Sequence, residues 1–241
     1  MNNGKESQRP SWEQLCSLAG FIVEFLATFF NASQVKYWLE HKTELKNKLR
    51  EVFSIVDEHV SIREEWQKFY KNHFGWDIDF SQVIIPVMPT NGKWRLLFIP
   101  KGMTLNFAFK ICEKLFASWK YCDDLDKAIS KNIRNTSIHY AVWVRDEVEP
   151  DAETLGKSTR KADPDMKIGI TLLERIIFEI KYFTETGNHL DVKGATFCSG
   201  SRNSGGDVPG ACLSGYGRFR MYYSFLDDSD SGYGIRSAVS L

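Results

Sequence analysis

Two cysteines near the C-terminus are the residues best suited to covalent chemistry in this sequence. Cys198 and Cys212 enclose a stretch rich in Gly and Ser, and Arg202 follows the first of them. A reactive cysteine needs a cationic neighbour that lowers the pKa of its thiol, and Arg202 could supply that charge. Other catalytic patterns are missing, because the sequence holds no G-x-S-x-G, H-E-x-x-H, Walker A or C-x-x-C. We therefore expect no catalytic residues, no cofactor and no enzyme activity, with a cysteine-based oxidase as the alternative.

The acidic residues and histidines do not form a metal-binding pattern. The stretch 226–232 suggests calcium superficially, but an EF-hand loop also needs a later Glu, and no Glu follows. Asp123, Asp124 and Asp126 follow a predicted helix and indicate a cap and a solvated surface. The five histidines lie in unrelated contexts, namely His41, His59, His73, His139 and His189. We expect no metal site.

Composition favours a folded protein that does not bind nucleic acid. Hydrophobic residues make up 43% of the 241 residues, enough for a sizeable core. Lys plus Arg and Asp plus Glu are 31 each, so the basic excess of a nucleic-acid binder is missing. The five cysteines are odd in number and irregularly spaced, which indicates reduced thiols. The location stays open between the cytoplasm, a phage particle and the cell surface.

The first third of the sequence predicts helices. The apolar run from Leu15 to Phe30 is interrupted by Glu24 and is too short for a clear membrane span. Acidic residues precede it, so it does not resemble a signal peptide, and we expect a buried helix. Further helices are predicted after Asn31, extending to Phe53, and from Ser61 to Tyr70. Residues 1–75 are thus expected to form a helical module that packs on the rest or joins copies of the chain as a homo-oligomer.

The remainder alternates between strands and helices, which predicts an α+β fold. Strands are expected at 83–86 and 95–99, joined by a turn at 90–92, and at 140–144. Thr104 is expected to cap a helix that ends near Phe116. Thr171 and Glu174 form a capping box for a second helix, which Gly187 would end.

The composition changes after Lys193. Lys, Glu, Gln and Trp are common up to that residue and absent from 194–241, which is rich in Gly, Ser, Asp, Tyr and Arg. Apolar and alternating runs predict ordered strands at 195–198, 218–225 and 235–239. Tyr, Ser, Gly and Asn also dominate recognition loops, because Tyr gives rigid contact area and the small residues give adaptable hydrogen bonds. The segment is therefore expected to be a folded recognition surface.

Several short sequences here resemble the variable proteins of diversity-generating retroelements. They are Leu172–Arg175 on a helix, Thr184–Asp191, Phe197–Arg202, Val208–Pro209 and Ile235–Ser240. The resemblance covers about residues 76–241 and implies a C-type lectin-like domain of a bacterial or phage protein. In that family a reverse transcriptase that mutates adenines rewrites the last β-containing stretch. Such codons encode neither Lys, Glu, Gln, Trp nor Met, which would explain the missing residue types and make Met221 an unmutated or inherited position.

The resemblance thus implies a ligand-binding protein with a hypervariable region at about residues 199–236. Its partner would be an unknown protein or surface ligand, without nucleic acid. The alternatives are a structural, oligomeric phage or cell-surface component and, less favoured, an oxidase similar to the formylglycine-generating enzymes, which share the lectin-type fold. The residues expected to face the ligand are Asn203, Asp207, Ser214, Tyr216, Arg218, Arg220, Tyr222, Tyr223, Asp228, Asp230 and Tyr233.

Overall fold

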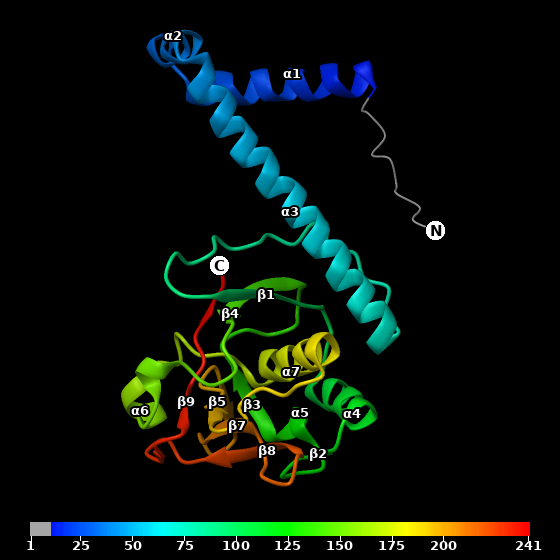
Figure 1. The fold of residues 1–241 in the computed structure, drawn as a ribbon, viewed down its shortest axis with the longest axis vertical. Helices are drawn as coiled ribbons and strands as arrows, with labels where there is room; N and C mark the ends of the chain where they lie inside the picture. The colour runs from blue at the N-terminus through cyan, green and yellow to red at the C-terminus, as the bar shows by residue number, and fades with distance from the viewer. Residues whose placement is uncertain (1–10) are drawn as a thin grey trace. The chain divides into compact units, whose positions relative to one another are not determined.

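The computed structural model describes residues 11–241, and for residues 50–58 it describes the backbone alone. The chain divides into two compact units (Figure 1). The first ends at Glu58, and the second begins at His59. Residues 1–10 of the predicted helical module lie outside the described residues.

The first unit is helical. It holds α1 (Trp12–Phe29), α2 (Ala32–Glu40) and the start of α3 (Lys42–Phe74). Capping boxes begin α1 and α2, in which Ser11 and Asn31 exchange hydrogen bonds with the residue three positions on. The prediction that α1 is buried is wrong for this chain, since neither α1 nor α2 has a buried residue. None of the described helices is both long and apolar enough to cross a membrane.

α3 differs from the sequence-based expectation. It is one continuous helix over Ser61, where a new helix was predicted, so the capping-box pattern at Ser61 and Glu64 does not interrupt it. The unit boundary also falls inside α3 and not after residue 75. The reason is that the last turns of α3 belong to the core of the second unit. There the Tyr70 hydroxyl donates to the Phe98 carbonyl at 2.6 Å, and Trp66 and Phe69 are buried.

The second unit is α+β and contains three sheets. The first has the order β1 (Trp94–Ile99), β4 (Tyr140–Arg145), β10 (Ala238–Val239). The second has the order β2 (Ser118–Trp119), β8 (Phe219–Ser224), β7 (Val208–Leu213), β5 (Ala195–Phe197), β9 (Tyr233–Ile235). The third pairs β3 (Ile129–Asn132) with β6 (Ser201–Asn203). The C-terminal stretch is therefore ordered β structure, as predicted.

One predicted strand is wrong. Residues 83–86 form no strand, and the partner of β1 is β4. Hydrogen bonds from side chains, instead of pairing with another strand, hold this segment. Arg63 donates to the Val83 carbonyl at 2.9 Å, and the Trp143 indole donates to the Pro86 carbonyl at 2.8 Å.

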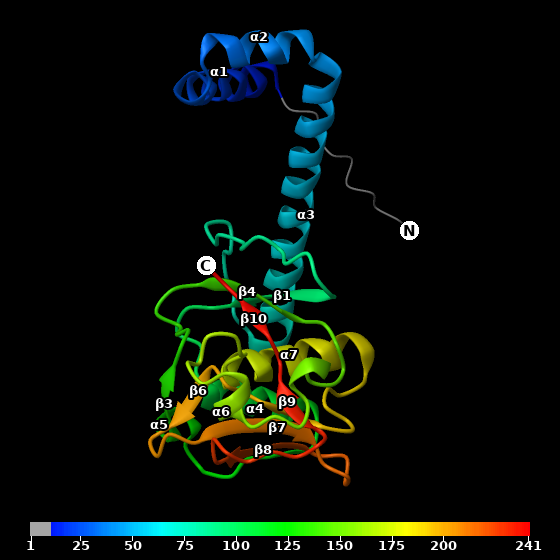
Figure 2. The same cartoon turned by 90° about the vertical axis from the view of Figure 1, so that its left-hand side faces the viewer.

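Helix α7 (Leu172–Thr186) lies between the first and second sheets of this unit (Figures 1 and 2). Its predicted capping box at Thr171 and Glu174 is present, and Gly187 ends it in the left-handed conformation at φ 70°. The first ten residues of α7 are all buried, including Glu174, Arg175 and Glu179. Buried charges must be paired. Neighbouring elements must therefore bring partners to the charged side chains of α7. The remaining helices are α4 (Leu105–Leu115), α5 (Leu125–Ala128), α6 (Thr159–Ala162) and the 3-10 turn η1 (Ala152–Thr154).

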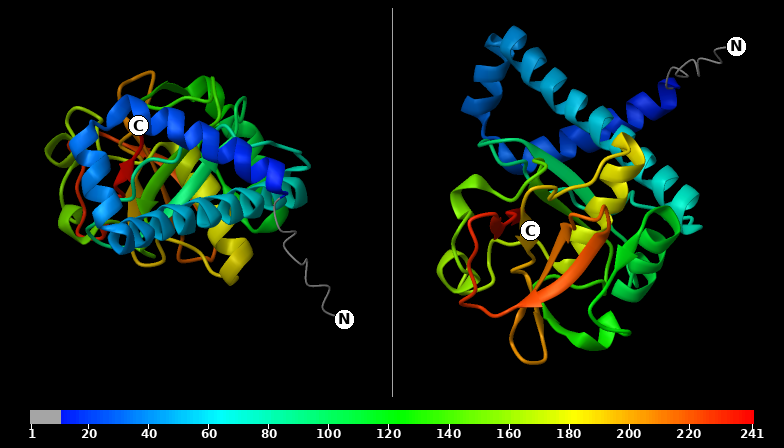
Figure 3. Two further views of the ribbon diagram at one scale, coloured as in Figure 1. Left: turned by 90° about the horizontal axis from the view of Figure 1, so that it is seen from above. Right: turned by 60° about the horizontal axis from the view of Figure 1, so that its bottom comes forward.

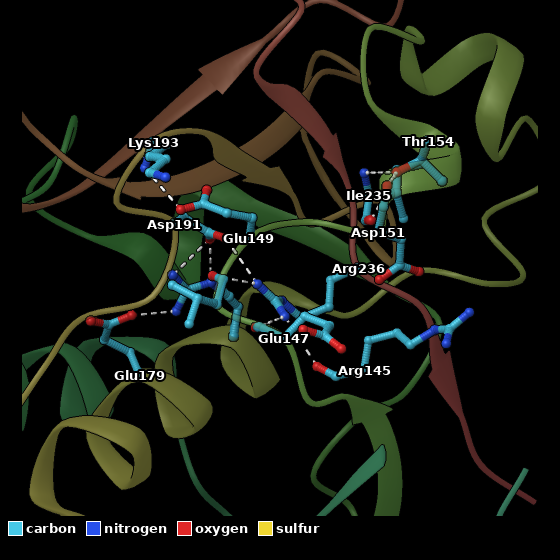
Figure 4. A network of polar contacts seen from close by, with 12 residues as sticks. Arg145, Glu147, Glu149, Asp151, Thr154, Glu179, Asp191, Lys193, Ile235 and Arg236 are labelled. Carbon is cyan, nitrogen blue, oxygen red and sulfur yellow. Dashed lines mark hydrogen bonds and ion pairs between the residues drawn. The ribbon is translucent and has the colours of Figure 1, made fainter. Parts of the chain in front are cut away.

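A buried charge network joins α7 to the C-terminal strands (Figure 4). One oxygen of the Asp191 carboxylate accepts from Arg175 at 2.8 and 3.0 Å, and the other accepts from Arg236 at 2.9 Å. Arg175 also donates to Glu179 at 2.6 Å. Arg236 sits between β9 and β10, where the chain passes from the second sheet to the first (Figure 2). Its guanidinium also donates to the carbonyls of Arg145, Glu147 and Val148.

Removing the Asp191 charge is expected to destabilise the second unit strongly. Asp191→Asn leaves two buried guanidinium groups short of a counter-charge, which costs about 3–5 kcal/mol. The matched control is Asp77→Asn, because Asp77 is exposed in a surface ion pair with Lys71 and its loss should cost less than about 1 kcal/mol. Urea unfolding of both variants measures the difference. Equal midpoints would show that the network adds nothing to stability.

Candidate functional site

The two faces of the second sheet have different surroundings. Ala211, Phe219 and Met221 point into the main core. Side chains alternate along a strand, so Cys212, which pairs with Arg220, and Gly210, which pairs with Tyr222, belong to the opposite side. We call this side the outer face; it carries Val208, Gly210, Cys212, Arg220 and Tyr222 of β7 and β8. In the right-hand view of Figure 3 the orange strands face the viewer with no helix in front of them.

One part of the outer face is covered. Phe197, Val208 and Ile235 form a second buried cluster on this face. Ala162 of α6 and Leu226 pack against this cluster. The covering loops are held by backbone hydrogen bonds, such as that from Arg160 to the Leu226 carbonyl at 2.9 Å.

An open pocket of about 660 Å³ occupies the remaining part of the outer face. It is lined by the turn between β7 and β8, by residues of both strands, by Tyr233 and by residues that precede the C-terminal segment. The lining residues are Trp119, Val192, Lys193, Gly194, Cys212, Leu213, Ser214, Gly215, Tyr216, Arg218, Arg220 and Tyr233. The pocket therefore combines aromatic and cationic side chains and has no acidic residue in its lining.

The pocket brings together five of the predicted ligand-facing residues. The turn begins where the Ser214 amide donates to the Arg218 carbonyl at 2.9 Å, and the Arg218 amide returns a bond to Ser214 Oγ at 3.2 Å. Gly217 permits the reversal, with φ at 69°. At the tip the Tyr216 side chain is 99% exposed. The five residues are Ser214, Tyr216, Arg218, Arg220 and Tyr233.

Tyr222 differs from the prediction that it faces solvent. Its ring lies on Gly210, so closely that a Cβ there would be 2.6 Å from Cζ. The hydroxyl is buried without a hydrogen-bond partner among the described residues, and burial raises the pKa of Tyr222. The tyrosine also packs against the second buried cluster. Tyr222 is therefore a packing residue that supports the outer face, because a glycine opposite it leaves room for its ring.

Three other predicted residues lie near one another away from the pocket. Asn203 donates to the Asp207 carboxylate at 3.0 Å, and the Asp207 amide donates to Asn203 Oδ1 at 2.8 Å, which fixes the turn between β6 and β7. Tyr223 contacts the Tyr121 ring edge-on, with 5.3 Å between centroids. The pKa of Tyr121 is raised to about 12, mainly by burial and to a smaller extent by neighbours that include Tyr223 and Asp207.

The two predicted aspartates of the last loop shape that loop. Asp228 accepts from the Phe225 amide at 2.8 Å, and Asp230 accepts from the Gly232 amide at 2.9 Å. Their neighbour Asp227 pairs with Arg160 at the surface. The described residues contain no group of three or more His, Cys, Asp or Glu side chains arranged to hold a metal ion.

The cysteines show no sign of activation. Cys198 is wholly buried, and burial raises the pKa of its thiol well above the usual value. The predicted activating residue, Arg202, donates to the carbonyls of Ser199 and Ser201, each at 2.7 Å. Burial also raises the pKa of Cys212, against the opposing effect of Arg220. All five cysteines are free thiols.

Sequence reasoning missed part of the pocket wall. Trp119 comes from β2, the edge strand that pairs in parallel with β8, and Val192 and Lys193 precede the segment of altered composition. A two-residue strand carries no periodic signal, so nothing in the sequence around Trp119 indicated this position. For Val192 and Lys193, the nearest signal in the sequence was the change of composition that begins directly after Lys193.

The chain matches no family model, and no curated protein or solved structure is similar enough to count as a match. Function must therefore be inferred from the geometry of the second unit.

Tyr216 and Tyr222 are expected to respond differently to truncation. Tyr216→Ala removes a fully exposed side chain and should change the free energy of unfolding by less than about 0.5 kcal/mol. Tyr222→Ala opens a gap above Gly210 and should cost about 2–4 kcal/mol, as for other packed aromatic rings. Urea unfolding of both variants provides the measurement. A Tyr222 variant as stable as the parent would place that ring among the ligand-facing residues after all.

Proposed function

We propose that this chain is a non-catalytic recognition protein, the variable protein of a diversity-generating retroelement. In this proposal the second unit is a C-type lectin-like domain, and the exposed residues of about 199–236 bind a protein or surface ligand and differ between copies of the gene. One observation carries the proposal: the segment without Lys, Glu, Gln and Trp is also the one that supplies most of the outer-face pocket.

The burial pattern within the segment supports the proposal. Val208, Ala211, Phe219 and Met221 are buried, and each is apolar. Met221, the one residue here that adenine mutagenesis of such codons cannot produce, is wholly buried and so fits an unmutated position. The exposed positions carry residue types that this mutagenesis produces. They are Ser204, Gly205, Gly206, Gly215, Tyr216, Gly217, Arg218, Arg220, Tyr223, Phe225, Asp227, Asp228, Ser229, Asp230 and Ser231.

The framework beneath these positions supports tolerance of change. The turn at 214–218 is held mainly by backbone hydrogen bonds and a glycine. Both ends of the segment are tied to buried elements: Ser201 Oγ accepts from the Leu172 amide at 2.9 Å, and Arg236 enters the charge network. The exposed residues Tyr216 and Arg218 of this turn belong to neither buried cluster, so replacing their side chains leaves both clusters intact.

Enzyme activity is not part of the proposal. An oxidase built on Cys198 would need its thiolate, the reactive form of a cysteine. The raised pKa of the buried Cys198 thiol opposes that form.

Sequencing the gene in many independent isolates of its source tests the proposal. Differences should gather at codons for exposed positions such as Tyr216, Arg218 and Arg220, and should spare Phe219 and Met221. A near-copy of the 3′ end that differs at adenines should lie beside a reverse transcriptase gene. Differences spread evenly along the gene, with no such copy, would refute it.

A second candidate function is assembly through α1, a helix with no buried residue. Its exposed side chains include Trp12, Phe21 and Phe29, each more than 60% exposed. Exposed apolar area on this scale marks an interaction surface, and we propose that a second copy of the chain covers it.

Sedimentation of the full chain tests the assembly. The parent chain should form oligomers, and Phe21→Ser combined with Phe29→Ser should shift it toward monomer. Val87→Ser is the matched control, because Val87 is 90% exposed and lies in the second unit. A monomeric parent chain, or a loss of oligomers caused equally by the control, would exclude α1 as the interface.

A further inference from the structure

The pocket of the outer face is lined by three cationic side chains. Lys193, Arg218 and Arg220 line it, and none of them forms an ion pair within the described part of the chain. Glu149 accepts a hydrogen bond from the Lys193 amide at 2.9 Å, but it does not belong to the lining. The lining residues therefore carry three positive charges and no negative one, while the Glu149 carboxylate lies beside the lining residue Gly194.

Arg218 and Arg220 stand apart from the other arginines. Every other arginine whose side chain is described donates to a carboxylate or to a backbone carbonyl: Arg63, Arg95, Arg134, Arg145, Arg160, Arg175, Arg202 and Arg236. An arginine fork matches a carboxylate with two parallel hydrogen bonds. The two arginines that lack an acceptor within the described residues are thus the two that line the pocket.

Aromatic rings position Arg220. Its guanidinium lies over the Trp119 ring at 5.3 Å from the centroid and over the Tyr222 ring at 5.7 Å. Such cation–π contacts hold the planar group in place without consuming its hydrogen-bond donors. The rings therefore favour one orientation of the Arg220 guanidinium and leave its donors available for an anion.

The pocket wall has two origins. Trp119, Val192 and Lys193 lie before the segment that we propose to vary, whereas Tyr216, Arg218 and Arg220 lie within it. A fixed cation and a fixed aromatic ring thus face residues that differ between copies. The fixed side can provide attraction for one chemical class of ligand, and the varying side can select among its members.

We propose that this pocket binds an acidic segment of a protein partner, whose Asp or Glu carboxylates pair with Lys193, Arg218 and Arg220. A volume of about 660 Å³ lies within the range of about 300–1,000 Å³ that is usual for ligand sites and suits a few side chains. Three cations in one pocket do not make the long basic stripe of a nucleic-acid binder. This inference rests on the proposed function, since it names the ligand class of the same face.

Fluorescence anisotropy with fluorescein-labelled hexaglutamate tests the inference on the full chain. Binding is expected at low salt, with a dissociation constant below about 1 mM, and it should weaken as salt screens the charges. Arg220→Gln should weaken binding by about 10-fold or more, because it removes the charged donors that pair with a carboxylate. Arg220→Lys keeps the positive charge but loses the planar guanidinium. Its affinity for hexaglutamate should lie between those of the parent chain and Arg220→Gln.

The matched control is Lys131→Gln, which removes one positive charge from an exposed residue of β3 outside the pocket. It should bind hexaglutamate like the parent chain, and all variants should keep the thermal transition. Absence of binding, or an equal loss for Lys131→Gln and Arg220→Gln, would overturn the inference. Tighter binding of a labelled decathymidylate, lost in Arg220→Gln, would overturn it in favour of nucleic acid.

The two proposals fail separately. Gene copies that vary as expected, together with a pocket that ignores hexaglutamate, would leave the recognition function standing and remove the acidic ligand. A gene that never varies, together with hexaglutamate binding that needs Arg220, would leave an anion-binding pocket on an invariant protein.

Discussion

The Asp191 carboxylate is the point at which the second unit is held together. It accepts from Arg175 on α7 and from Arg236 on the chain between β9 and β10, and all three side chains are wholly buried. Its backbone carbonyl accepts from the Leu213 amide at 3.1 Å, so it also fixes the end of β7. Burying charges is expensive unless every partner is in place. The network thus ties the position of helix α7 to that of the chain that crosses between the two sheets.

This arrangement separates the residues that stabilise the fold from those that face outward. The inner side of the second sheet packs on the main core, and the charge network holds the chain where it leaves that sheet. The outer turn at 214–218 depends on its own backbone bonds, on the Ser214 hydroxyl and on a glycine. A change at Tyr216 or Arg218 therefore leaves the network and the core untouched, which is the physical requirement for a surface that varies.

The sequence predicted elements whose signals are local and missed those that depend on distant packing. α7 was predicted from a capping box at Thr171 and a terminal Gly187, because both act within one helical turn. The false strand at 83–86 is apolar like a strand, but side chains from elsewhere satisfy its carbonyls. Trp119 could not be assigned to the pocket, because only the pairing of β2 with β8 brings it there. Five predicted surface residues do meet in the pocket: four lie on β8 or in the turn before it, and Tyr233 reaches the pocket from β9.

Tyr222 shows that the outer face has constraints of its own. The ring fits only because Gly210 opposite it has no side chain, and it forms one side of the seat for the Arg220 guanidinium. A larger residue at position 210 would displace the ring, and loss of the ring would leave Arg220 supported by Trp119 alone. Positions 210, 220 and 222 are therefore coupled, although all three lie within the segment proposed to vary. Variation that preserves an oriented cation must keep the glycine and the aromatic ring together, so the accessible diversity is smaller than the number of exposed positions suggests.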